Sequence, residues 1–247
     1  MTQEALSYEH TDEDEAITAQ MAHVVDSYDS YMRKMTLGRE RKLRDLTVKW
    51  AQVGPGDSVL EVGCGTGSLT LAAKRQTGPS GSVCGIDVLP GMIEQSRRKA
   101  AEAGAEIDFR LGSINAIPHA DDHFDVVLCS FMIFHTSELV RRQGIAEIRR
   151  VLKPGGRLMV IDLGLPPKPL PRKIASLLFR WVKDDVGDLR PLLHASGFAD
   201  VQVVPAPFRV FGFQLIALLR AQKGPLTSSR SIQETPDLVA KVRELSS

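Results

Sequence analysis

Several features are scarce in this chain of 247 residues, and each shortage narrows the classes of protein to which it can belong. It has only three cysteines, none at a zinc-binding spacing, so neither a disulfide framework nor a metal site is expected. No lysine or arginine precedes Arg33, and no apolar segment stands near the start, which argues against a secretory signal. No uncharged apolar run reaches the ~20 residues of a membrane-spanning helix. We therefore expect a reduced, cytoplasmic protein.

The composition is balanced, with 43% hydrophobic residues, 25% charged residues and a formal net charge of +1. These fractions are typical of a globular chain that buries a large core. So small a net charge gives no overall attraction to nucleic acid, which is not an expected partner. Locally the charge is uneven, because residues 1–15 are acidic and a basic cluster occupies residues 33–44. We interpret the cluster, including Arg44, as the water-facing side of two helices.

Apolar periodicity and turn residues divide the chain into parts. Strands alternate with helices in its central region, which is the pattern of a doubly wound α/β sheet. We expect an acidic flexible arm over 1–15, a helical cap over 16–53 with helices at 16–35 and 39–52, a core domain over 54–223, and a polar tail over 224–247. The expected core strands are 58–63, 82–87, 106–111, 124–130, 157–163, 199–205 and 208–220. Helices are expected at 67–76, 90–103, 137–152 and 188–196, and a helical lid at about 165–187.

Residues 58–67 read Ser-Val-Leu-Glu-Val-Gly-Cys-Gly-Thr-Gly and are the most informative run. A short apolar strand leads into a glycine turn, after which Thr66 or Ser68 is placed to cap a helix. Such a turn at a helix start can cradle a nucleotide-sized ligand. The third glycine of a dinucleotide-binding turn is replaced by Ser68, and Glu61 would repel a pyrophosphate. A ligand with an ammonium or sulfonium group fits better than a nicotinamide dinucleotide.

The run resembles motif I of the class I S-adenosylmethionine-dependent methyltransferases. Further motifs similar to those of this family follow in the expected order, so that the resemblance covers roughly residues 54–223. They are residues 85–87, 124–128 and 150–158. The last is similar to the quinone-biosynthesis C-methyltransferases and their small-molecule relatives. The resemblance implies a seven-stranded, mostly parallel sheet, in which one antiparallel strand is inserted next to the fifth strand.

The resemblance also implies S-adenosylmethionine as cofactor and suggests which residues bind it. Gly63, Gly65 and Gly67 would let the backbone approach the methionine portion, and Glu61 would meet its ammonium. Asp87, at the end of the second strand, would accept both ribose hydroxyls. The remaining expected contacts are Cys64, Thr66, Val88, Met92, Ser113, Ile114, Ser130, Tyr28 and Tyr31. Ser113 departs from the family, since many relatives carry an aspartate there that accepts from the adenine amine.

Methyl transfer is an in-line displacement that needs mainly positioning and exclusion of water. A general base is required where the acceptor loses a proton. His135 lies just beyond the fourth strand and titrates near neutral pH, so it is the candidate base or acceptor anchor. A structural histidine that only bonds the backbone is the alternative, and Asp162 is a further residue that could face the acceptor.

The expected acceptor is a small, rather apolar molecule that is quinone-like, aromatic or lipid-like. Residues 168–183 mix basic and apolar side chains, so this segment could either close over an apolar acceptor or lie on an anionic membrane. The second interpretation raises the alternative of a phospholipid N-methyltransferase peripheral to the membrane. A cofactor-binding partner subunit without catalysis is another alternative.

Overall fold

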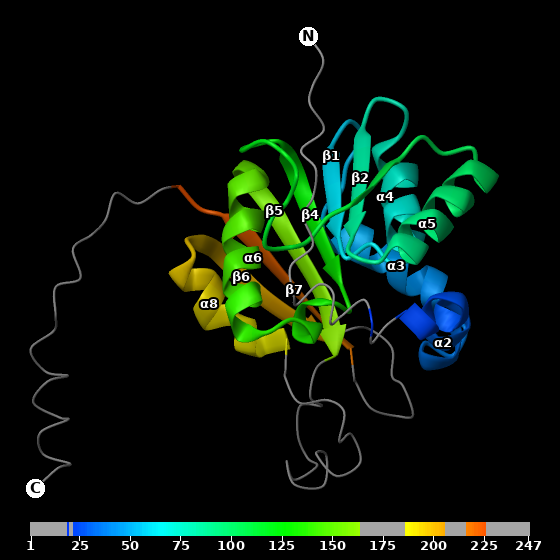
Figure 1. Cartoon of the computed structure of the whole chain (residues 1–247). Coiled ribbons are helices and arrows are strands. Elements are labelled where there is room, and N and C mark those ends of the chain that lie inside the picture. The colour runs from blue at the N-terminus through cyan, green and yellow to red at the C-terminus, as the bar shows by residue number, and fades with distance from the viewer. Residues whose placement is uncertain (1–18, 20–21, 164–185, 206–215, 226–247) are drawn as a thin grey trace, which may run out of the picture.

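The computed structural model describes residues 19, 22–163, 186–205 and 216–225. The expected acidic arm, most of the lid including 168–183, and nearly all of the polar tail lie outside these residues. Within them the chain forms one seven-stranded sheet in the order β3-β2-β1-β4-β5-β7-β6, with β7 antiparallel to both its neighbours (Figure 1). The prediction of a seven-stranded, mostly parallel, doubly wound α/β fold is confirmed.

The strands alternate with helices along the chain, as the periodicity predicted. The strands are β1 (Ser58–Val62), β2 (Ser82–Asp87), β3 (Asp108–Leu111), β4 (Phe124–Ser130), β5 (Leu152–Leu163), β6 (Phe198–Pro205) and β7 (Ile216–Lys223). The α-helices are α2 (Tyr28–Met35), α3 (Glu40–Trp50), α4 (Ser68–Thr77), α5 (Pro90–Glu102), α6 (Glu138–Val151) and α8 (Arg190–Ala195). Three 3-10 helices, η1 (Ala22–Ser27), η2 (Ile133–His135) and η3 (Val186–Leu189), complete the described elements.

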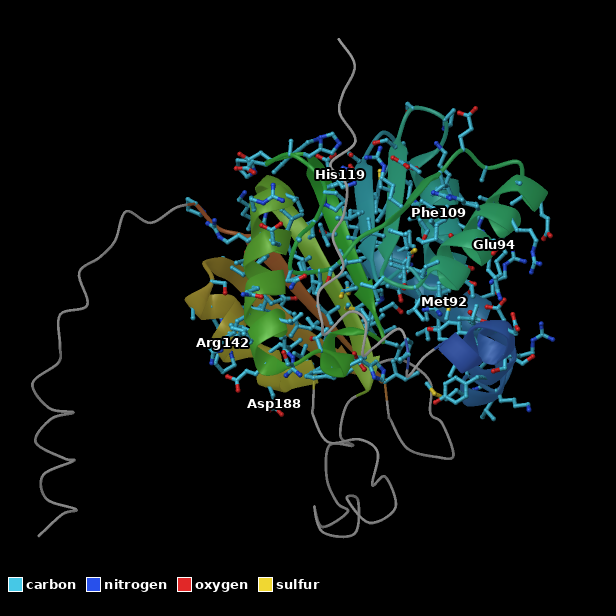
Figure 2. All side chains as sticks on the ribbon, viewed as in Figure 1. Met92, Glu94, Phe109, His119, Arg142 and Asp188 are labelled. Carbon is cyan, nitrogen blue, oxygen red and sulfur yellow. The ribbon has the colours of Figure 1, made fainter. Side chains whose placement is uncertain are left out.

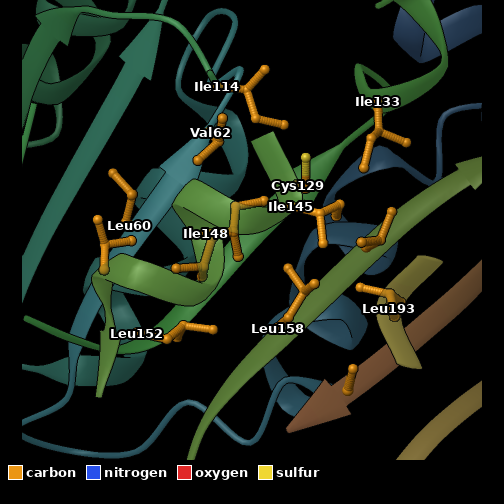
Figure 3. Packing of buried hydrophobic residues seen from close by; sticks show 14 of the residues in the cluster. Leu60, Val62, Ile114, Cys129, Ile133, Ile145, Ile148, Leu152, Leu158 and Leu193 are labelled. Carbon is orange, nitrogen blue, oxygen red and sulfur yellow. The ribbon is translucent and has the colours of Figure 1, made fainter. Parts of the chain in front are cut away.

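Helices cover both faces of the sheet. Side chains alternate between the two faces along each strand, and the central strands carry apolar side chains on both. On one face α6 packs Ile145 and Ile148 against strand residues that include Leu60 and Leu158 (Figure 3). On the other face α3 and α4 pack over the neighbouring strand positions, with Leu43 and Leu69 among the buried side chains. Apolar burial on both faces fixes the register of the central strands, and with it the position of every strand end.

Several boundaries differ slightly from the sequence prediction, such as the end of β7 at Lys223 and the start of β3 at Asp108. Two differences are larger. β5 begins at Leu152, five residues early, because Leu152 pairs with Phe124 before a register shift lets Arg157 pair with Val126. The proline and two glycines between them therefore stay within the strand and bend it. The cap segment around residues 22–27 is a 3-10 helix and does not continue the α-helix expected over 16–35. Among the described residues, no helix is long and apolar enough to cross a membrane, and no metal-ligand cluster occurs there.

Candidate active site

A cavity opens where β1, β2 and β4 end at one edge of the sheet. Gly63 follows β1, Asp87 ends β2 and Ser130 ends β4, and all three line the cavity. The strand order places β1 between β2 and β4, so parallel strands bring these three positions together from distant parts of the sequence. In Figure 2, Met92 lies toward this end of the sheet and His119 toward the other. Open α/β sheets bind ligands at this edge.

The glycine turn after β1 has the conformation that its sequence predicts. Gly63, Gly65 and Gly67 all have positive φ, at 68°, 51° and 78°, a region that other residues adopt only with strain. A Cβ on Gly67 would also lie 2.9 Å from the Cβ of Ser96. Gly67 takes the N-cap position of α4 and no side chain caps that helix, so the expected cap by Thr66 or Ser68 is wrong.

Asp87 joins the glycine turn to the second strand end. Its Oδ2 accepts the Gly65 N–H at 2.8 Å, and its Oδ1 accepts the Leu89 N–H at 3.0 Å. The carboxyl is buried, and this desolvation raises its pKa, while the backbone N–H groups oppose the shift. A carboxylate has about four acceptor sites, more than the N–H groups of Gly65, Val88 and Leu89 occupy. Asp87 can therefore hold the turn in place and still accept bonds from a ligand's hydroxyls.

Glu61 lies beneath the turn and does not line the cavity. Its side chain is only 2% exposed and accepts a hydrogen bond from the Thr70 hydroxyl. Burial raises the pKa of Glu61 to about 7, and the Arg44 guanidinium opposes this rise. Cys64 is also buried, which raises the pKa of its thiol well above the usual value. Glu61 therefore has no place on the cavity wall from which it could contact a ligand directly.

Arg44 was expected to face water, and this expectation is wrong. The residue is 5% exposed, and its Nη1 donates to the Ser130 Oγ at 2.7 Å. Its guanidinium also lies 6.0 Å from the centre of the Phe131 ring. Arg44 thus supports two residues of the cavity wall from behind, although it comes from α3, far away in the sequence.

The helical cap is fastened to the glycine turn by polar contacts. Asp29 on α2 forms an ion pair with Lys99 on α5, with Oδ2 and Nζ at 2.6 Å. The Thr66 hydroxyl donates to Asp29 at 2.7 Å and accepts from Lys99 at 2.8 Å. We call Asp29, Lys99 and Thr66 the latch. It holds α2 so that Tyr28 lines the cavity, whereas Tyr31 is 50% exposed and does not line it.

The opposite wall of the cavity comes from β4 and the residues after it. Ser130, Phe131, Met132 and His135 line this side. Phe131 has a φ of 54°, an uncommon conformation for a bulky residue. Partial burial lowers the pKa of His135 below its usual value, so the imidazole is largely neutral at pH 7 and can accept a proton.

The remaining lining residues are mostly apolar. Val62, Val88, Leu89 and Met92 come from the β1 and β2 side, while Gly112, Ser113, Ile114, Thr136 and Val140 complete the wall. The structure therefore brings Tyr28, Gly63, Gly65, Asp87, Val88, Met92, Ser113, Ile114, Ser130 and His135 of the predicted set around one cavity. Glu61, Cys64, Thr66, Gly67 and Tyr31 lie around it without lining it. Sequence reasoning missed Arg44 and the latch residues Asp29 and Lys99. It also missed the lining residues Val62, Leu89, Gly112, Phe131, Met132, Thr136 and Val140.

Comparison with known proteins agrees with this geometry. A family model described as a methyltransferase domain matches residues 59–156. A ubiquinone/menaquinone biosynthesis C-methyltransferase from Geobacter sulfurreducens is 34% identical over 202 residues, which cover 81% of this chain and 78% of the relative. The chain belongs to the S-adenosylmethionine-dependent methyltransferases.

Further matches are a second curated methyltransferase and two solved structures. A demethylmenaquinone methyltransferase from Symbiobacterium thermophilum is 34% identical over 145 residues, covering 58% of this chain and 57% of that protein. A solved methyltransferase from Aquifex aeolicus aligns with a TM-score of 0.60 at 23% identity, over 73% of this chain and 89% of its own. A solved [4+2]-cyclase has a TM-score of 0.63 at 23% identity, over 75% and 81% of the two chains. These structural likenesses show the fold.

The residues of the cavity fit the family's cofactor. The glycine turn leaves backbone exposed at Gly63 and Gly65, the Asp87 carboxylate has free lone pairs, and Met92 offers an apolar side chain. S-adenosylmethionine carries a methionine portion, a ribose and an adenine, and these three parts need a close backbone, a hydroxyl acceptor and an apolar slot.

Proposed function

We propose that this methyltransferase transfers a methyl group to a small, rather apolar acceptor that is quinone-like, aromatic or lipid-like. The lining of the cavity supports this proposal. Asp87 is the only carboxylate among the described lining residues, and no lysine or arginine is among them. A strongly charged acceptor would therefore leave its charge unpaired, whereas Phe131, Met132 and Val140 offer apolar contact.

The cavity residues take separate parts in this proposal. The glycine turn meets the methionine portion, Asp87 accepts the ribose hydroxyls, and Val88 and Met92 flank the adenine. Ser113, Ile114 and Ser130 contribute polar groups near the adenine and the amine, and Tyr28 closes the site from the cap. When bound, S-adenosylmethionine supplies an electrophilic methyl group, because its sulfonium becomes a neutral thioether once that methyl group is transferred in line to a nucleophile.

His135 is proposed as the general base or acceptor anchor. It lies at the rim on the β4 side and is the only histidine among the described residues of the lining. Because its pKa is lowered, the neutral imidazole accepts a proton from an acidic C–H or O–H of the acceptor. General bases of this kind contribute about 100-fold or more to the rate.

The test compares His135→Ala with the control His123→Ala, since His123 is an exposed histidine that does not line the cavity. Turnover is measured at saturating S-adenosylmethionine with a demethylated quinone, a phenol and phosphatidylethanolamine vesicles as acceptors. We expect transfer to a quinone-like or phenolic acceptor, with a kcat about 100-fold lower for His135→Ala and unchanged affinity for S-adenosylmethionine.

Two results would contradict parts of this proposal. Equal turnover by the wild type and His135→Ala would remove the histidine from the mechanism. Transfer only to phosphatidylethanolamine would establish the alternative of a phospholipid N-methyltransferase.

A further inference from the structure

Five exposed basic residues and two exposed apolar residues lie close together in the sequence at the junction of α2 and α3. They are Tyr31, Arg33, Lys34, Leu37, Arg39, Arg41 and Lys42, and we call this surface the basic corner. All seven side chains are exposed. This surface is separate from the cavity lining, because none of its residues is among the residues that line the cavity.

The positive charge of the basic corner is not neutralised by neighbouring carboxylates. Within the described part of the chain, none of its five basic side chains forms an ion pair. Glu40 lies among them in the sequence, but it is largely buried and bonds to the inward-facing Arg44. Exposed arginines elsewhere do form such pairs, as Arg98 does with Glu102 and Arg142 does with Glu138. The corner therefore carries five exposed cations without an ion-pair partner among the described residues, and the nearby Asp45 is paired with Arg75 instead.

Two large apolar side chains are exposed within this charge. Tyr31 is 50% exposed and Leu37 is 51% exposed. Leu37 has a φ of 51°, an uncommon conformation for a leucine, and it places the side chain on the turn between the helices. Exposed tyrosine and leucine beside lysine and arginine are the residues that insert at the headgroup level of a bilayer.

The basic corner lies next to the cavity. Tyr28 lines the cavity, and Tyr31 follows it by three residues on the same helix, which places the two on neighbouring parts of the helix surface. Figure 1 shows α2 near the end of the sheet at which the parallel strands finish. A surface that rests on the corner would therefore lie close to the cap of the site.

We propose that the basic corner binds an anionic lipid bilayer, with Tyr31 and Leu37 in the headgroup layer and the five cations against the lipid phosphates. This rests on the proposed function, because an apolar acceptor dissolves in the bilayer and would enter the site from there. Positive charge alone would also suit a nucleic acid. The exposed leucine and tyrosine on the same short segment as the charges favour the bilayer.

The test measures binding of the full chain to phosphatidylcholine vesicles with and without phosphatidylglycerol. We expect binding only to the anionic vesicles, with affinity falling steeply as salt rises. The double variant Arg33→Gln/Lys34→Gln should bind about 30-fold more weakly, given about 1 kcal/mol for each basic residue at the surface. The variant Tyr31→Ser/Leu37→Ser should also bind more weakly, at unchanged net charge.

The control variant is Arg98→Gln/Arg142→Gln, which removes the same charge from exposed positions on α5 and α6. It should bind anionic vesicles nearly as well as the wild type. The proposal is overturned if the wild type ignores anionic vesicles, if it binds neutral vesicles equally, or if the corner and control variants lose the same affinity. Binding to a nucleic acid without binding to anionic vesicles would also overturn it.

Separate assays distinguish this proposal from the proposed function. S-adenosylmethionine affinity, and turnover with a water-soluble acceptor analogue, should be the same in the corner variants and the wild type. Vesicle binding without turnover of any apolar acceptor would contradict the proposed function but not the bilayer binding by the basic corner. Turnover of the soluble analogue without vesicle binding would contradict the bilayer binding but not the proposed function.

Discussion

The carboxylates in or directly beside the strands have different partners at the two ends of the sheet. At the end where the parallel strands begin, carboxylates pair directly with lysine or arginine across neighbouring segments. The ion pairs there are Asp57 with Arg157 at 2.7 Å, Asp125 with Lys153 at 2.8 Å, and Asp122 with Lys223 at 2.6 Å. These pairs are partly exposed, so each adds little to stability, although together they tie strand starts and loops to one another.

At the end where the parallel strands finish, Glu61 and Asp87 are buried and accept bonds from neutral groups instead. The partner of Glu61 is a hydroxyl, and the partners of Asp87 are backbone N–H groups. Burial raises the pKa of both carboxyls. Ionisation of these groups in the folded protein therefore lowers its stability. Buried groups with raised pKa values that gather at one cavity are typical of a functional site.

Among substitutions that test this difference between the two ends, Asp87→Asn should have the largest effect, which is on the affinity for S-adenosylmethionine. We expect affinity for S-adenosylmethionine to fall at least about 100-fold, since hydrogen bonds to a charged group contribute about 1.5–3 kcal/mol each. The change also places an amide N–H against one of two backbone N–H groups. Calorimetry with S-adenosylmethionine and its demethylated product measures the loss.

Asp125→Asn is the matched change at the opposite end of the sheet. Asp125 also accepts a backbone N–H, that of Ser58 at 2.9 Å, and bonds to Lys153. Its replacement should lower stability slightly and leave the affinity unchanged. Equal losses of affinity in the two variants would mean that Asp87 acts only through the fold.

The next largest effect is a change in the pH dependence of stability in Glu61→Gln. Because the folded-state pKa of Glu61 is raised from 4.5 to about 7, the native protein holds this proton more tightly than the unfolded chain. The free energy of unfolding of the wild type should therefore fall by roughly 3 kcal/mol relative to that of Glu61→Gln as the pH rises from about 4 to about 8. Urea unfolding of both proteins across this range measures the difference, and parallel curves would contradict it.

Arg44→Met sharpens the same measurement. The Arg44 charge lowers the pKa of Glu61, and Asp87 raises it. Without the guanidinium, the loss of stability should extend to higher pH. The control Arg41→Met removes an exposed charge from the same helix and should leave the pH dependence as it is in the wild type.

The sequence predicted most of the sheet because local signals define its strands. β2 and β4 have the predicted bounds, since each is a short apolar run that ends in a turn or polar residue. The glycine turn was identified from its own spacing, and Asp87 from the resemblance to the methyltransferases together with its place at a strand end. Local signals of this kind require no knowledge of distant contacts.

The missed features depend on partners far away in the sequence. Arg44 bonds to Ser130 across 86 positions, and Thr66 bonds to Asp29 across 37. In the helical pattern of α3, Arg44 looks like any other basic residue, so only the packed structure shows that it is buried. The early start of β5 likewise depends on pairing with β4, which the proline and glycines of that segment conceal.

The smallest expected effects come from removing one lysine at each end of the sheet. The ion pair of Lys99 belongs to the latch, and that of Lys153 belongs to the strand starts. Both pairs are partly exposed, so each substitution by methionine should change the free energy of unfolding by about 1 kcal/mol or less. Only Lys99→Met should weaken S-adenosylmethionine binding, by about 5-fold, because α2 then holds Tyr28 less firmly over the site.

The rate of dissociation separates these two lysines most clearly. The volume of the cavity is about 100 Å³, less than the ~300 Å³ of a small ligand site. We therefore expect binding of S-adenosylmethionine to widen the cavity, and α2, which carries the lining residue Tyr28, is the element that the latch holds. A loosened latch should speed dissociation in stopped-flow measurements, while Lys153→Met dissociates at the wild-type rate. The same rate in all three proteins would show that α2 is held by its apolar contacts and not by the latch.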